Sequence, residues 1–186
     1  MVAVFAVVVS GCGLGQPETP AGSESFVGIE LPPRPRDIPL RDVNPCDLLT
    51  EAQRAEIGLQ RPPVFSPSDT SVFFEGPEPL CTSRANEPRA FGVGVATPYD
   101  GLGIAALTGR PVTSELMVIE VQGFPAVLGR PTTDPLFCQV LVDVGPGAAL
   151  NVQFRDGGRR NIPQTDLCEG AVQVANAAMT TLLSLS

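Results

Sequence analysis

Residues 137–155, F-C-Q-V-L-V-D-V-G-P-G-A-A-L-N-V-Q-F-R, decide the fold of this chain. Apolar and polar side chains alternate in residues 137–144 and again in residues 148–155, which is typical of strands with one buried face. The G-P-G triplet at 145–147 separates the two runs, and glycine and proline favour the tight turn of a β-hairpin. The sequence therefore predicts two antiparallel strands joined at residues 145–147.

A C-terminal helix is predicted after this hairpin. Asp166 and Glu169 have the spacing of a capping box, which would start the helix beside them. Apolar side chains then recur at helical intervals and would line one face of the helix: Val172, Ala175, Met179 and Leu182.

Shorter elements are predicted upstream of the hairpin. Residues 45–57 would be helical, because Thr50 and Gln53 have capping-box spacing and Gly58 suits a helix end. Strands are expected at 70–74, 90–97 and 116–121, with a short helix at 101–108. Together these elements indicate an α+β domain over residues 44–186, an antiparallel sheet with helices packed on one side.

Four cysteines lie in the predicted domain: Cys46, Cys81, Cys138 and Cys168. An even number in an exported chain indicates two disulfides, for which three connectivities are possible. Cys46–Cys81 with Cys138–Cys168 is favoured because the two bonds would close loops of similar length. Cys46–Cys168 with Cys81–Cys138 remains an alternative. No CxxC pair is present, so we expect no zinc or other metal site.

The N-terminus has the features of a lipoprotein signal peptide. Residues 2–9 (VAVFAVVV) are apolar but fall short of the roughly 20 residues that a membrane-spanning helix needs. They lead into V-S-G-C at 9–12, which resembles the lipobox of bacterial lipoproteins. We expect residues 1–11 to be a signal peptide and Cys12 to carry acyl chains such as palmitate, which would anchor the protein to the extracytoplasmic face of the cell membrane. Because no basic residue precedes the apolar run, we also expect the natural start to lie further upstream.

A linker is predicted between the lipid and the domain. Residues 12–43 are rich in proline and show little hydrophobic periodicity. Such a segment cannot bury enough apolar surface to offset the entropy lost on ordering, so we expect it to be flexible.

The composition of the chain excludes several classes of function. The net charge is −8, which argues against nucleic-acid binding. There is no histidine and arginine is the only basic residue type, so Ser-His-Asp, Cys-His and Ser-Lys catalysis are all excluded. We expect a non-catalytic protein without a cofactor.

An enzyme that uses carboxylates is the alternative. It would draw on the acidic residues around Cys81: Asp69, Glu75, Glu78 and Glu87. A solvated loop is the simpler interpretation of these residues.

Two features are candidate binding sites. Gly92, Gly94 and Ala96 leave one face of the predicted strand 90–97 without large side chains, so this face could floor an apolar groove or receive a closely packed helix. Arg159 and Arg160 follow the turn after the hairpin and could bind an anion together with Arg155, although Asp156 would partly neutralise them.

Several short motifs resemble a known family. They are N-P-C-D-L-L-T at 44–50, Cys81, V-Q-G-F-P-A-V at 121–127, Cys138 and L-C at 167–168. In order and spacing they resemble the actinobacterial lipoproteins grouped as DUF3558, a family of unknown function, over about residues 43–183. The resemblance implies a lipid-anchored envelope protein and supplies no activity. We therefore expect a module that binds a lipid, a peptide or an envelope protein partner.

Overall fold

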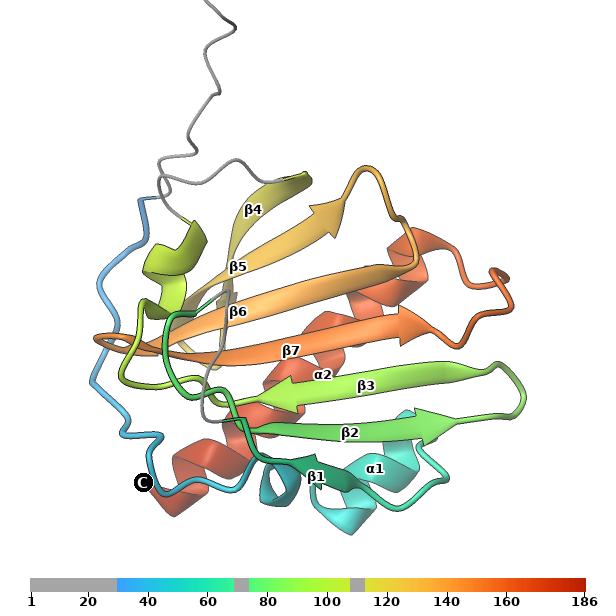
Figure 1. Cartoon of the computed structure of the whole chain (residues 1–186), viewed down its shortest axis with the longest axis horizontal. Helices are drawn as coiled ribbons and strands as arrows, with labels where there is room; N and C mark the ends of the chain where they lie inside the picture. Colours follow the sequence, from blue (N-terminus) through green and yellow to red (C-terminus); the bar gives the residue numbers. More distant parts are fainter. Residues whose placement is uncertain (1–29, 69–73, 108–112) are drawn as a thin grey trace, which may run out of the picture.

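The computed structural model of the chain describes residues 30–68, 74–107 and 113–186 (Figure 1). The elements in chain order are the 3-10 helix η1 (Pro45–Leu48), helix α1 (Glu51–Ile57), strands β1 (Val64–Ser66), β2 (Leu80–Ala85) and β3 (Phe91–Ala96), the 3-10 helix η2 (Gly103–Leu107), strands β4 (Ser114–Val121), β5 (Phe124–Pro131), β6 (Phe137–Gly145) and β7 (Ala148–Asp156), and helix α2 (Gln164–Leu185).

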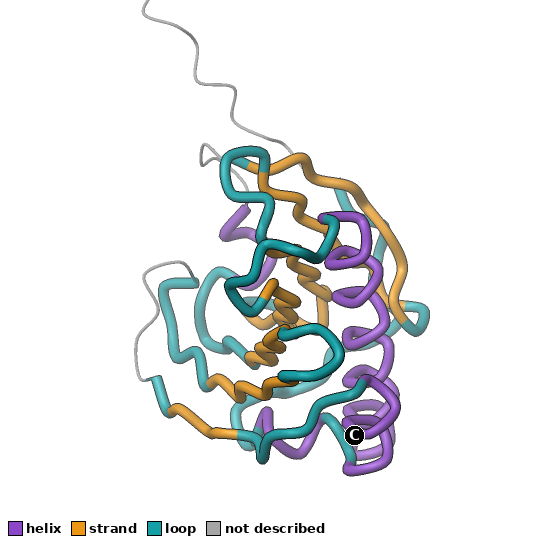
Figure 2. Tube along the Cα trace, turned by 90° about the vertical axis from the view of Figure 1, so that its right-hand side faces the viewer, coloured by secondary structure: helices purple, strands orange, loops and turns teal. Residues whose placement is uncertain are grey.

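Seven strands form one antiparallel sheet in the order β1-β2-β3-β7-β6-β5-β4. The long helix α2 lies along one side of this sheet, as the turned view in Figure 2 shows. The predicted α+β class, with an antiparallel sheet and helices packed on one side, is confirmed. None of the helices in the described ranges is both long enough and apolar enough to cross a membrane.

The predicted hairpin is present as β6 and β7. Its strands pair from Phe137 opposite Arg155 to Gly145 opposite Ala148, with a register shift between Asp143 and Gly145. Alternate residues of both strands are buried beneath α2, because the period of two places them on one face. These two strands are the centre of the sheet.

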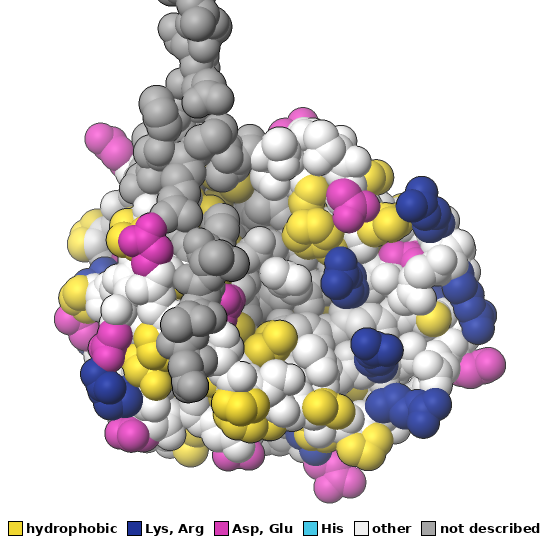
Figure 3. Space-filling view, viewed as in Figure 1, with side chains coloured by type: hydrophobic (Ala, Val, Ile, Leu, Met, Phe, Trp, Pro, Cys, Tyr) yellow, Lys and Arg dark blue, Asp and Glu magenta, His cyan; other side chains and the backbone are white. Residues whose placement is uncertain are grey.

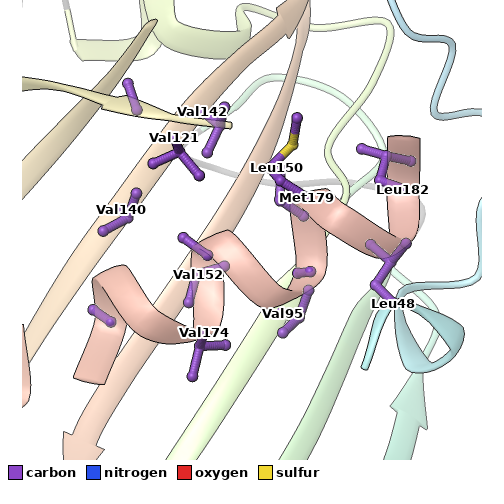
Figure 4. Close-up of a cluster of buried hydrophobic side chains, with 14 of the residues drawn as sticks. Leu48, Val95, Val121, Val140, Val142, Leu150, Val152, Val174, Met179 and Leu182 are labelled. Carbon is purple, nitrogen blue, oxygen red and sulfur yellow. The ribbon is translucent and has the colours of Figure 1, made fainter. Parts of the chain in front are cut away.

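Helix α2 supplies the other half of the main core. Its fully buried side chains are Leu167, Ala171, Val174, Ala175, Ala178, Met179 and Leu182. Figure 4 shows Val174 and Met179 among side chains of the central strands. Three of the seven are alanines, so the helix backbone comes close to the sheet. The helix backbone also lies close to the Phe154 ring at Gly170. Any side chain there would collide with the ring, because its Cβ would lie only 2.9 Å away.

The predicted capping box of α2 is wrong. The helix begins at Gln164 after Pro163, and no side chain caps it. Asp166 therefore lies inside the first turn, where its charge suits the helix dipole and where it pairs with Arg89 at 3.1 Å.

The predicted N-terminal helix is present in two parts, η1 and α1. Thr50 caps α1, and Thr50 and Gln53 form the reciprocal hydrogen bonds of a capping box. Gly58 ends the helix with φ +87°, a conformation that glycine adopts at little cost.

Two disulfides join the helical layer to the sheet. Cys46 of η1 bonds to Cys81 of β2, and Cys138 of β6 bonds to Cys168 of α2. This is the pairing that the sequence favours. By loop-entropy arithmetic each bond contributes on the order of 3–4 kcal/mol to the free energy of unfolding.

The folded core begins earlier in the chain than residue 44. Ile38 and Leu40 are buried in the main core, and the Ile38 N–H donates to the Val144 carbonyl at 2.7 Å. Arg34 binds Asp143 at 2.8 Å. The last part of the predicted flexible linker is therefore packed on β6. The apolar side chains of Ile38 and Leu40, on either side of Pro39, hold it there. Residues 12–29 of that linker lie outside the described residues.

The remaining strand predictions differ in outcome. Strands 90–97 and 116–121 are present as β3 and β4, and the helix expected at 101–108 is the 3-10 helix η2. Of the strand expected at 70–74, only Phe74 lies within the described residues, and it is in a buried turn. Strands β1, β2 and β5 were not predicted.

The loop between β7 and α2 is organised around the buried Asp156. Its Oδ1 accepts hydrogen bonds from the backbone N–H groups of Gly158 and Arg160, and its Oδ2 accepts from those of Asn161 and Ile162, at 2.7–3.1 Å. Burial raises the pKa of this carboxyl, but the four donors outweigh burial and lower the pKa below its ordinary value.

Asp156→Asn should lower the free energy of unfolding at pH 7 by about 1–3 kcal/mol, because an amide offers one acceptor oxygen to four donors. The folded-state pKa lies below the unfolded value of about 3.9, so the carboxylate's contribution is present above that pH and is lost as the pH falls through the lowered pKa. The difference between wild type and variant should therefore shrink in acid. Urea unfolding at a series of pH values measures it.

Asp134→Asn is the matched control, since this exposed carboxylate lies in the turn before β6 and its loss should change stability by less than about 0.5 kcal/mol. A deficit in D156N that stays constant with pH would contradict the role of the charge.

Candidate functional site

Gly92, Gly94 and Ala96 lie on the face of the sheet that turns away from α2. Their neighbours Val93 and Val95 point to the other face and are buried in the main core. The face of β3 that the sequence predicted to be bare is thus the open face, and no helix of the described residues packs on the two glycines.

Part of this open face is covered. Phe74 and η2 residues Ile104 and Leu107 bury Val127 of β5 and Leu141 of β6 in a second, smaller core. The cover ends beside β7, so the open part of the face lies over β2, β3 and β7.

A groove of about 310 Å³ lies on this open part, with Gly94 and Ala96 in its floor. Its walls carry polar side chains as well as Leu80. Asn151 donates to Glu78 at 3.2 Å and accepts from Gln139 at 2.8 Å, so a chain of hydrogen bonds crosses three elements. The sequence left open either an apolar groove or a closely packed helix on the glycine face; the structure has a groove there, and most of its lining residues are polar.

The four residues predicted to bind a ligand do not converge on one site. Gly94 lines the groove just described, and Gly92 lines a separate cavity of about 240 Å³ at the end of the strands. Arg159 and Arg160 lie in the loop around Asp156 and line neither cavity. Ligand binding by these residues stays a prediction.

The acidic residues of the alternative, enzymatic interpretation are also separated. Asp69 lies outside the described residues. Glu78 precedes β2 and Glu87 follows it, so a six-residue strand, roughly 20 Å long, lies between them. Glu75 lines neither cavity. In the described ranges no three Asp, Glu or Cys side chains are placed to hold a metal ion.

A different surface, at the edge strand β4, was not predicted. β4 pairs only with β5 among the described strands, so its outer edge carries unpaired backbone groups. Met117 and Val118, adjacent on β4 and therefore on opposite faces, are 61% and 47% exposed. An exposed edge eight residues long with two large apolar side chains is uncommon, since proteins usually protect such edges.

An apolar cavity of about 230 Å³ lies beside this edge, between β4, β5 and the first turns of α2. Leu116, Met117 and Leu128 line it together with Cys168, and the charged groups of Glu115, Arg130 and Glu169 lie around it. The sequence signal for this surface was the apolar run L-M-V-I at 116–119, which by itself also fits a buried strand.

Cys12, the predicted lipidation site, lies outside the described residues, as do residues 1–11.

Comparison with protein families gives a match over most of the chain. The family model DUF3558, a protein of unknown function, matches residues 7–181. The search of curated proteins and the search of solved structures found no match. The family match covers nearly all of the chain and confirms the resemblance drawn from its motifs: the protein belongs to the DUF3558 family.

Proposed function

We propose that this chain is a lipoprotein anchored through Cys12 to the extracytoplasmic face of the cell membrane, and that its domain is a non-catalytic module. The module binds an extended, basic segment of an envelope protein partner along the free edge of β4.

Three features support the anchor. Residues 2–9 suit a signal peptide, V-S-G-C at 9–12 suits lipidation, and two disulfides join the domain. Structural disulfides persist in oxidising compartments and are rare in the cytosol.

The exposed edge of β4 is the observation that carries the binding proposal. An extended peptide can add to a free sheet edge, where backbone hydrogen bonds supply affinity and pockets for alternate side chains supply specificity. Here Met117 lines the cavity between β4 and α2, so a side chain of the added strand would enter an apolar site next to the edge.

The charge around the edge favours a basic segment. Glu115, Glu120 and Glu169 are all exposed there, and among the described residues Arg130 lies 4.0 Å from Glu115.

Protein extracted from its native membrane should begin at Cys12 and carry two or more acyl chains on that residue, which intact-mass measurement and peptide mapping would detect. Cys12→Ser should abolish acylation, so that no lipid-modified form of the chain is detected by the same measurements. An unmodified thiol on Cys12 in membrane-extracted protein would contradict the anchor.

A synthetic peptide of alternating valine and lysine should bind the full chain carrying Cys12→Ser and shift the backbone amide resonances of β4. A peptide of alternating valine and glutamate should not. Met117→Lys should weaken binding at least about tenfold, because it removes a contact worth roughly 1.5–3 kcal/mol and adds a like charge.

Leu185→Lys is the matched control, since Leu185 is 64% exposed at the far end of α2. Equal binding of both peptides, or equal loss in M117K and L185K, would show that the edge is not the site. Self-association that M117K abolishes would identify a second copy as the occupant and contradict the proposed partner.

A further inference from the structure

Six of the twelve arginines of this acidic protein lie at one end of the sheet. β2, β5 and β7 run in the same direction, so their last residues meet at one end. In Figure 3 most of the dark blue side chains in view lie over this end of the open face, on the right. Arginines at these strand ends and in the adjoining loops form the group: Arg61, Arg84, Arg130, Arg155, Arg159 and Arg160.

Two of these arginines flank a glycine on the open face. Gly92 pairs with Arg84 of β2 on one side and with Arg155 of β7 on the other. Directly opposite residues in an antiparallel sheet point to the same face, so the two arginine side chains rise on either side of a position that has none. Since neighbouring strands are about 4.8 Å apart, the two backbones are about 10 Å apart.

The three residues line one cavity of about 240 Å³. The stem of Arg155 lies against the glycine, with its Cγ 3.4 Å from where a Cβ of Gly92 would be. Its guanidinium lies over the Phe137 ring at 5.9 Å, a cation–π contact that leaves the N–H donors in the guanidinium plane available.

The charges of this cavity are not balanced within the protein. In the part of the chain that the structure describes, neither Arg84 nor Arg155 makes an ion pair. Asp156 also lines the cavity, but both its oxygens already accept backbone hydrogen bonds from the loop before α2. The side chain of Asn86 adds a neutral polar group.

We propose that Arg84, Gly92 and Arg155 form a binding site for a phosphoryl group, as a phosphate monoester or diester. Two guanidinium groups present planar sets of donors that match the oxygens of phosphate, and each can bind two oxygens at once. The bare glycine floor lets the anion sit between them.

The site goes beyond the proposed function, because it uses other residues at the opposite side of the sheet from β4. The site uses residues of β2, β3 and β7, and strands β6 and β5 lie between β7 and β4, so failure of either proposal leaves the other standing. The phosphoryl group could belong to the headgroup of an anionic phospholipid or to a soluble phosphate compound, and the test separates these sources.

The test uses the full chain with Cys12→Ser, so that no attached lipid contributes. In one arm, inorganic phosphate is titrated while the amide resonance of Gly92 is followed. In the other, co-sedimentation is measured with vesicles of phosphatidylcholine alone and with vesicles that also contain phosphatidylglycerol. Binding in either arm should be weakened about tenfold by Arg84→Gln and by Arg155→Gln, and should fall as salt rises.

Arg36→Gln is the control for net charge. Arg36 is exposed, binds Ser186 at the other end of the molecule, and its loss should leave binding within about twofold. Gly92→Glu is a second variant, which keeps both arginines but places a carboxylate between them and should abolish binding.

Phosphate binding that needs both arginines would identify a soluble ligand. Binding only to vesicles that contain phosphatidylglycerol, and only when both arginines are present, would identify a lipid headgroup. No binding in either arm, or equal weakening by R36Q and by the site variants, would overturn the proposal. Because Arg84 and Arg155 are exposed, the variants should retain the thermal stability of the wild type.

Discussion

The packing of α2 against β6 and β7 is the interaction on which the rest of the structure depends. The helix contributes alanines and Gly170 where the backbones approach, and larger side chains such as Val174 and Met179 where there is room. Apolar burial of this kind is the dominant favourable term in folding, and it is proportional to area, so the longest helix and the two central strands supply most of it. Cys138–Cys168 fixes the start of this helix to β6, and Cys46–Cys81 fixes η1 to β2. The segment before η1, which carries Ile38 and Leu40, then covers the core next to the hairpin turn.

One helix cannot cover a sheet of seven strands on both faces, and the uncovered parts differ in chemistry. Near β5 and β6 the other face is closed by Phe74 and η2. Over β2, β3 and β7 it remains open, with a polar groove over Gly94 and a separate cavity beside Gly92 that two arginines line. At the opposite edge, β4 exposes apolar side chains and carboxylates. The molecule thus has a basic end and an acidic, apolar edge, and the two proposals assign each of them a partner of complementary charge.

The elements that the sequence predicted are those whose signals are local. The alternation of residues 137–155, the capping box at Thr50 and Gln53, and the helical spacing of α2 each lie within one element. β5 was missed because nearly all its residues are buried on both faces, so no alternation appears. β2 was missed because its buried face carries only the small side chains of Cys81, Ser83 and Ala85, which do not stand out as an apolar alternation. The glycine face of β3 was visible in the sequence, but what lies on it was not. Arg84 comes next to Arg155 only through the pairing of β3 with β7, and the exposure of Met117 depends on the place of β4 in the strand order.

Amide hydrogen exchange resolved by NMR tests the central claim, that α2 and the central strands form the stable core while the outer edge of β4 is free. Amides of β6, β7 and α2 should exchange only through global unfolding and should be the slowest in the domain. In β4 every second amide points away from β5 and should exchange orders of magnitude faster than its neighbours, which bond to β5. Uniform protection along β4, equal to that of β6, would contradict the account, because it would mean that the edge is covered in the isolated protein.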